Sequence, residues 1–210
     1  TVSLELNGAR EKEAANQTVA AIAARYTLVE QGQLLMNAAT EAQLAAEQVD
    51  RAWKTVLKGD DLARQAAQLV TETTAENVEA SKNKTKEALA AFDEAYQAFS
   101  DVLSTYASAD FSQYFDYIGK RQESLGYAIA SDDAILAKNK EEATAQNNAY
   151  NIADAEAAVL AKSLPEDPAV IIDETFAEAT ADVAKAYSTA RLQARSADAF
   201  ISDYLGAESK

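Results

Sequence analysis

Apolar side chains recur at alternating steps of three and four residues through the middle of this chain, over residues 111–160. Because an α-helix completes a turn in about 3.6 residues, such spacing puts side chains on one helix face. This face holds Phe111, Phe115, Ile118, Gln122, Leu125, Ile129, Asp132, Leu136, Asn139, Ala143, Gln146, Tyr150, Ala153, Ala157 and Leu160. A narrow apolar face packs against other helices, so the pattern predicts a helical assembly with coiled-coil-like packing.

Residues that end helices are scarce. The 210 residues include two prolines and six glycines, well below ordinary usage, so little of the chain is available for turns. We therefore predict an all-α fold, an elongated antiparallel up-down four-helix bundle formed by a single domain over residues 1–210. It would be either one continuous bundle or two stacked sub-bundles.

Three candidate turns divide the chain into helices expected at about 9–57, 61–106, 111–163 and 169–205. The first turn is Lys58-Gly59-Asp60-Asp61, where glycine would end one helix and aspartate would cap the next. The second turn, at residues 108–110, offers Ser and Asp as caps. The third contains Pro165 and Pro168, which remove backbone donors. Short links of this kind join antiparallel neighbours.

The first expected helix has a face lined mainly by small residues. Its heptad positions are Leu28, Leu35, Ala42, Val49 and Val56, with Val19 and Ile22 expected to begin the same face upstream. Small side chains let helix axes approach closely but bury less apolar area per turn. We expect close helix packing along this face.

Composition restricts the function. Nineteen basic and thirty-four acidic residues give a formal charge of −15, which disfavours nucleic acid and anionic lipid as partners. The chain contains neither Cys nor His, so thiol chemistry, histidine acid–base catalysis and most structural zinc sites are excluded. We expect a protein that is not an enzyme and that binds no cofactor.

Four polar residues interrupt the apolar face of residues 111–160: Gln122, Asp132, Asn139 and Gln146. A buried polar group without a partner costs about 1–3 kcal/mol, so each of them requires an explanation. One interpretation is that they fix the helix register through cross-helix hydrogen bonds. The other is a polar pocket that receives a small ligand between helices.

Three tyrosines, Tyr114, Tyr117 and Tyr127, lie off this apolar face. They either pack on a second face or form an exposed aromatic patch for a protein or glycan partner, because tyrosine supplies contact area at low entropic cost.

Residues 81–86 lack large apolar side chains, which predicts a poorly packed waist. The same stretch holds a basic cluster of Lys82, Lys84 and Lys86. These lysines are either solvated or contact the acidic surface of a neighbouring copy of the chain.

These observations favour a non-enzymatic, exported helical protein acting as a structural or protein-interaction module at or outside the bacterial cell surface. Its partner would be another protein or a further copy of the chain. The sequence starts at Thr1 without an initiator Met, which we interpret as favouring export with removal of a signal peptide. No uncharged apolar run approaches the roughly 20 residues of a membrane span.

The passage from Arg51 to Tyr106, with its Lys58-Gly59-Asp60 turn, resembles the helical extracytoplasmic domains of bacterial chemoreceptors and sensor kinases. The resemblance implies an alternative function, a periplasmic ligand-sensing domain that binds a small molecule between helices. No ligand-binding residue is carried over. Hydrophobic spans outside residues 1 and 210 would favour the sensor.

Overall fold

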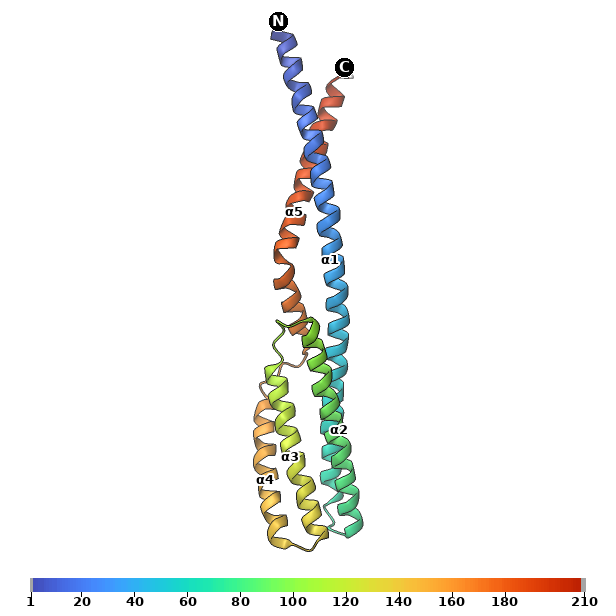
Figure 1. Ribbon diagram of the computed structural model, residues 1–210, viewed down its shortest axis with the longest axis vertical. Coiled ribbons are helices and arrows are strands. Elements are labelled where there is room, and N and C mark those ends of the chain that lie inside the picture. Colours follow the sequence, from blue (N-terminus) through green and yellow to red (C-terminus); the bar gives the residue numbers. More distant parts are fainter. Residues whose placement is uncertain (1, 209–210) are drawn as a thin grey trace. The chain divides into compact units, whose positions relative to one another are not determined.

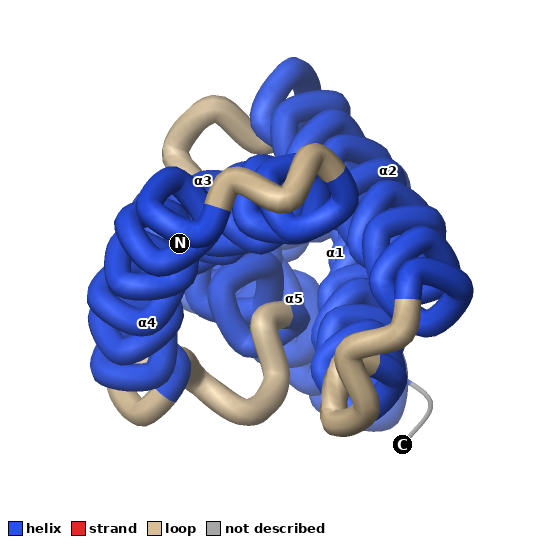
Figure 2. Tube along the Cα trace, turned by 90° about the horizontal axis from the view of Figure 1, so that it is seen from below, coloured by secondary structure: helices blue, strands red, loops and turns tan. Residues whose placement is uncertain are grey.

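The computed structural model describes the backbone of residues 2–208 and the side chains of residues 5–206. Within this part the chain is all-α, with five helices joined by short loops and no strand (Figures 1 and 2). The helices are α1 (Val2–Leu69), α2 (Ala75–Thr105), α3 (Ser112–Leu136), α4 (Lys140–Ala161) and α5 (Ala169–Glu208). None of the helices described combines the length and apolar character that crossing a membrane requires.

The chain divides into two compact units. Unit 1 combines the residues up to Ala42 with those from Phe176 onward, and unit 2 runs from Gln43 to Thr175. Unit 1 is thus built from the first part of α1 and most of α5. Unit 2 contains the rest of α1, all of α2, α3 and α4, and the beginning of α5.

In unit 1, α1 and α5 pack as an antiparallel pair. The Arg25 guanidinium pairs with Asp198 at 2.6 Å, whereas further along α1 the ring of Tyr187 packs against Gly32. The residue number of the contact on α5 falls, from 198 to 187, as the residue number on α1 rises from 25 to 32, so the two helices are antiparallel. The buried residues of this pair are mostly alanines: Ala21, Ala24, Ala42, Ala190, Ala194 and Ala197.

The beginning of the inner face of α1 differs from expectation. Ala21 and Ala24 are buried, whereas Val19 and Ile22 are 67% and 49% exposed. Steps of four and seven residues back from Leu28 reach the two alanines, so the small residues face α5. The larger Val19 and Ile22 lie on another face of the same helix.

Unit 2 has four longer helical segments, one each from α1, α2, α3 and α4, and aromatic rings join the first three. Rings of α2 and α3 stack closely, with centroids of Phe99 and Tyr114 5.3 Å apart. Trp53 of α1 meets Tyr114 edge-on at 5.4 Å. Aromatic pairs at such distances stabilise a core beyond the area they bury, so residues far apart in sequence hold α1, α2 and α3 together.

The turn expected at residues 58–61 is absent, because α1 continues through it to Leu69. Gly59 is buried, and a Cβ added there would lie 3.0 Å from the Phe92 ring of α2. The glycine therefore makes room for an aromatic side chain rather than ending a helix. α1 and α2 are instead joined after Leu69, and Thr74 caps α2 by accepting a hydrogen bond from the Asn77 backbone N–H at 3.2 Å.

The single helix expected over residues 111–163 is two helices, α3 and α4. Lys138 adopts a left-handed φ of 60°. The backbone N–H of Asn139 donates to the Ala134 carbonyl at 2.8 Å, and that of Lys138 to the Ile135 carbonyl at 2.9 Å. These two bonds form a Schellman motif, which ends a helix. Asn139 also caps α4, because its side-chain oxygen accepts from the Glu142 N–H at 3.2 Å.

Substituting Lys138→Gly should raise the free energy of unfolding of unit 2 by about 0.5–1 kcal/mol, because glycine adopts a positive φ without a Cβ clash. Urea unfolding followed by the fluorescence of Trp53, the single tryptophan, measures unit 2 directly. The control is Ala137→Gly, next to Lys138 but right-handed at φ −75°, which should lower stability by a similar amount. Equal losses in both variants would contradict the left-handed turn.

Candidate functional site

A cavity of about 550 Å³ lies among the four helical segments of unit 2. This volume is typical of small-molecule sites. Its lining comes from α1, the α1–α2 loop, α2, α3, the α3–α4 turn and α4: Ala63, Ala66, Ala67, Val70, Thr73, Ser81, Thr85, Leu125, Ala128, Ser131, Asp132, Ile135, Lys138, Lys140, Ala143, Thr144, Asn147 and Tyr150.

Small side chains create this space. Facing positions of α1, α3 and α4 carry alanines, while α2 contributes Ser81 and Thr85, both buried. A core position filled by Ala or Ser leaves the volume that a Leu would occupy, and a packed interior cannot fully collapse to fill it. The stretch at residues 81–86, expected to pack poorly, therefore borders the cavity.

Asp132 is the acidic residue of the lining, and it is only 6% exposed. Burial raises the pKa of its carboxyl to about 6, since the charged form loses its hydration. A hydrogen bond from the Ser81 hydroxyl and the positive charge of Lys82 oppose this shift, whereas Asp133 and Glu79 add to it. The cavity thus contains a carboxyl group whose pKa lies well above that of an ordinary aspartate.

Two further hydroxyl groups of the lining are already engaged with backbone carbonyls. Thr85 donates to the Ser81 carbonyl at 3.0 Å, and Ser131 donates to the Ala143 carbonyl at 3.3 Å. An ionised carboxylate has about four acceptor positions, of which the Ser81 hydroxyl uses one. Asp132 therefore retains capacity to accept hydrogen bonds from a bound molecule.

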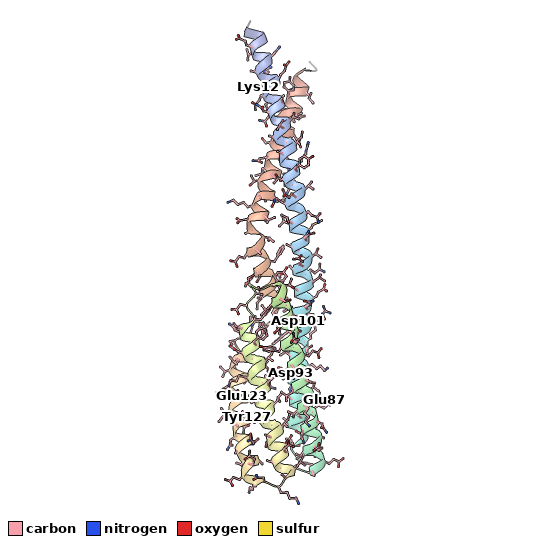
Figure 3. All side chains as sticks on the ribbon, viewed as in Figure 1. Lys12, Glu87, Asp93, Asp101, Glu123 and Tyr127 are labelled. Carbon is pink, nitrogen blue, oxygen red and sulfur yellow. The ribbon has the colours of Figure 1, made fainter. Side chains whose placement is uncertain are left out.

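The other three polar residues of the apolar face lie elsewhere. Gln122 donates across helices to Asp93 of α2 at 2.6 Å (Asp93 is labelled in Figure 3). Asn139 caps α4, and Gln146 donates to Glu142 on its own helix at 2.6 Å. Gln122 thus makes the kind of cross-helix hydrogen bond that would fix helix register. Asp132 instead lines a cavity, as expected of a residue in a ligand pocket.

The three tyrosines do not form one exposed patch. Tyr114 is 1% exposed, and its hydroxyl donates to the Pro165 carbonyl at 2.9 Å. Tyr117 is also buried, and its hydroxyl donates to Asp60 at 2.7 Å. Tyr127 is half-buried on α3 (Figure 3). Both buried rings pack in the core because α3 is enclosed on more than one face.

Two of the three lysines in the basic cluster have carboxylate partners within unit 2. Lys82 pairs with Asp133 of α3 at 2.6 Å, and Lys84 pairs with Glu87 on its own helix at 2.8 Å. Lys86 is exposed. Much of the positive charge of the cluster is therefore compensated within the chain.

Sequence reasoning missed an ionic cluster centred on Arg121 of α3. Its Nε donates to Asp60 of α1 at 2.8 Å, another guanidinium nitrogen bonds Asp154 of α4, and the guanidinium carbon lies 5.7 Å from the centre of the Phe92 ring. Burial and the bond to Asp60 raise the pKa of Tyr117 in the same cluster. All these groups are paired with one another, which indicates a structural role.

The described residues contain no group of three or more Asp and Glu side chains arranged to hold a metal ion. The charged groups at the centre of unit 2 are paired with one another, and Asp132 is the acidic residue of the cavity lining. The site is therefore suited to binding by shape and hydrogen bonding.

A second candidate site lies on unit 1. Large apolar side chains on α1 are 49–75% exposed at steps of three, four and seven residues, and we call them the α1 stripe: Val19, Ile22, Tyr26, Val29 and Met36. One position of the repeat, Gln33, is polar. Repeating exposed apolar residues of this kind mark an interaction surface.

Asp132→Asn should stabilise unit 2 above neutral pH by up to about 3 kcal/mol, because a pKa raised from 3.8 to about 6 makes ionisation unfavourable in the folded state. Stability associated with protonated Asp132 is complete below its unfolded pKa and is lost as the pH rises through about 6. The gain should therefore shrink below about 1 kcal/mol near pH 4.

Urea midpoints from Trp53 fluorescence at about pH 4 and about pH 8 test this. The control is Asp116→Asn, which removes the same charge from an exposed position of α3. A gain from Asp132→Asn that is equal at both pH values, or no larger than the control's, would contradict the assignment.

A comparison with protein-family models found no match, and comparisons with curated proteins and with solved structures found no similar protein. The function is therefore inferred from the residues of this chain.

Proposed function

We propose that this protein is a non-enzymatic, self-associating helical interaction module that acts at or outside the bacterial cell surface. The observation that carries the proposal is the α1 stripe, whose five large apolar side chains remain exposed in unit 1. The location is part of the proposal, and cell fractionation with an antibody against the chain tests it.

The same proposal includes a finer architecture, in which the four segments of unit 2 form an antiparallel up-down four-helix bundle. Its support is the short connections between α1, α2, α3 and α4 and the side-chain bonds that join α1, α3 and α4 at Arg121. Short connections favour antiparallel neighbours.

The proposed partner of the α1 stripe is the same stripe on a second copy. Residues at alternating steps of three and four meet their equivalents when two helices run in parallel about a two-fold axis. Unit 1 buries mostly alanines between α1 and α5, which contribute less apolar area than its exposed Val, Ile, Met and Tyr side chains. Pairing two copies would bury these larger residues.

Charges beside the stripe fit a parallel arrangement. In a repeat with Val19 and Val29 at core positions, Arg25 and Glu30 occupy the flanking positions, five residues apart. In a parallel pair these flanking positions face each other across the interface, so each Arg25, which also pairs with Asp198 of its own chain, lies opposite Glu30 of the other copy. Such pairs set orientation more than affinity.

Replacing Ile22 and Val29 together with Ser should weaken self-association at least tenfold, because both side chains leave the shared apolar surface. Sedimentation equilibrium of the full chain over a range of concentrations measures the effect. The matched control is Ile152→Ser with Val159→Ser, the same residue types at the same spacing and similarly exposed on α4.

Orientation is tested by reversing charges. Glu30→Arg should weaken the dimer a few-fold, because it sets two positive charges opposite each other, whereas Glu30→Gln, which removes the charge without reversing it, should weaken the dimer less. Arg25 is left unchanged because it also pairs with Asp198 of α5. A chain that stays monomeric at all concentrations, or a dimer weakened only by the α4 control, would refute the proposed interface.

A second candidate function, ligand sensing, is favoured by the cavity of unit 2. A sensor requires coupling between ligand binding and another equilibrium of the protein. A ligand bound in the cavity should therefore change the dimer dissociation constant by fivefold or more, measured by sedimentation with and without saturating ligand. Ligand binding that leaves this constant unchanged would exclude sensing through self-association.

A further inference from the structure

We propose that the cavity of unit 2 binds a small organic cation, a primary amine with an aliphatic or aromatic body, whose ammonium group is held by Asp132. The inference shares with the second candidate function, ligand sensing, only the assumption that the cavity binds a ligand. It requires neither signalling nor self-association.

The walls of the cavity select the body of the ligand. α1 lines it with Ala63, Ala66 and Ala67. Val70 of the α1–α2 loop and Leu125 and Ile135 of α3 add larger apolar surface. The Thr85 and Ser131 hydroxyls donate their hydrogens to backbone carbonyls. Most of the lining therefore offers apolar contact, which suits a hydrocarbon chain or ring.

Asp132 selects the polar group. It is nine-tenths buried, lines the cavity and receives one hydrogen bond from Ser81. An ammonium group supplies three donors and a compensating charge, whereas an alcohol supplies one donor and no charge. A charge-assisted hydrogen bond is roughly twice as strong as a neutral one. An amine should therefore bind more tightly than an alcohol of the same size.

Charges of both signs surround Asp132. On α2, Glu79 is close enough to influence Asp132, and Lys82 is paired with Asp133 at 2.6 Å. The lining that α1 contributes carries no charged residue. The cationic residues of the lining are Lys138 and Lys140, at the α3–α4 turn, and Tyr150 of α4 is the remaining titratable group.

Protonation of Asp132 should make amine affinity depend on pH, which a purely apolar cavity would not do. With a pKa near 6, Asp132 is mostly ionised at about pH 7.5 and about nine-tenths protonated at pH 5. A protonated carboxyl must release its proton before it can pair with an ammonium group. Amine binding should therefore weaken about tenfold between these pH values, whereas alcohol binding should not change.

The experiment titrates the full chain by calorimetry with hexylamine, hexan-1-ol and hexanoate at about pH 7.5 and about pH 5. At the higher pH, hexylamine should bind at least tenfold more tightly than hexan-1-ol, and hexanoate should bind more weakly than either. Asp132→Asn should abolish the preference for the amine and keep alcohol binding. The exposed control, Asp116→Asn, should leave both unchanged.

Substitutions that fill the cavity test whether the ligand binds there. Ala128→Leu and, as a second variant, Ala143→Leu place a large side chain in the lining and should abolish binding of both amine and alcohol, with helicity checked by circular dichroism. Equal affinities for amine and alcohol, tighter binding of hexanoate, amine binding that survives both filled variants, or no binding of any probe would each overturn the proposal. If amine and alcohol bind as expected but dimerisation does not change, the sensor function is refuted and the ligand proposal stands.

Discussion

The arrangement of unit 2 depends on one partly enclosed guanidinium group. Arg121 of α3 joins Asp60 of α1 and Asp154 of α4, and its side chain is only 11% exposed. Removing one partner of such a cluster leaves an uncompensated charge away from water, which costs about 3–5 kcal/mol for buried pairs. The cluster also fixes the positions of α1, α3 and α4 along their axes, because a shift of one helix along another would separate the charges. Gly59 is part of the same arrangement. Because it has no Cβ, the Phe92 ring can pack against α1, and the Arg121 guanidinium lies over that ring.

The cluster separates two kinds of interior along α3. Before Arg121, the helix carries the aromatic residues that pack against Trp53 and Phe99. After it, the helix borders the cavity with Leu125, Asp132 and other residues. The aromatic packing and the ionic cluster fix the spacing of the helices beside the cavity. Small side chains of α1 and α2 border the cavity there, together with Leu125 and Ile135 of α3. A cavity lined by alanines persists because the helices that surround it cannot move together.

The helical class could be predicted because steps of three and four residues, with few prolines and glycines, leave no other regular structure. The positions of two turns could not. Gly59 is typical of a helix end, yet its small size is needed by a residue of another helix, and no local pattern reveals that contact. Residues 137–139 interrupt the apolar repeat without Gly or Pro, because Lys138 takes the left-handed conformation itself. Asp132 was identifiable as a polar residue on an apolar face, whereas the partners of Arg121 are far apart in sequence.

The two proposed activities belong to different units because the units differ in how much apolar surface they can bury. The four longer segments of unit 2 bury a core of their own and border a partly open cavity, whereas the two segments of unit 1 leave the α1 stripe exposed. α1 and α5 each take part in both units as continuous helices, so they are the elements through which a sensor would have to act. Continuity alone does not create coupling, however. A ligand shifts dimerisation only by the difference between its affinities for dimer and monomer, so tight binding with equal affinities would leave the stripe unaffected.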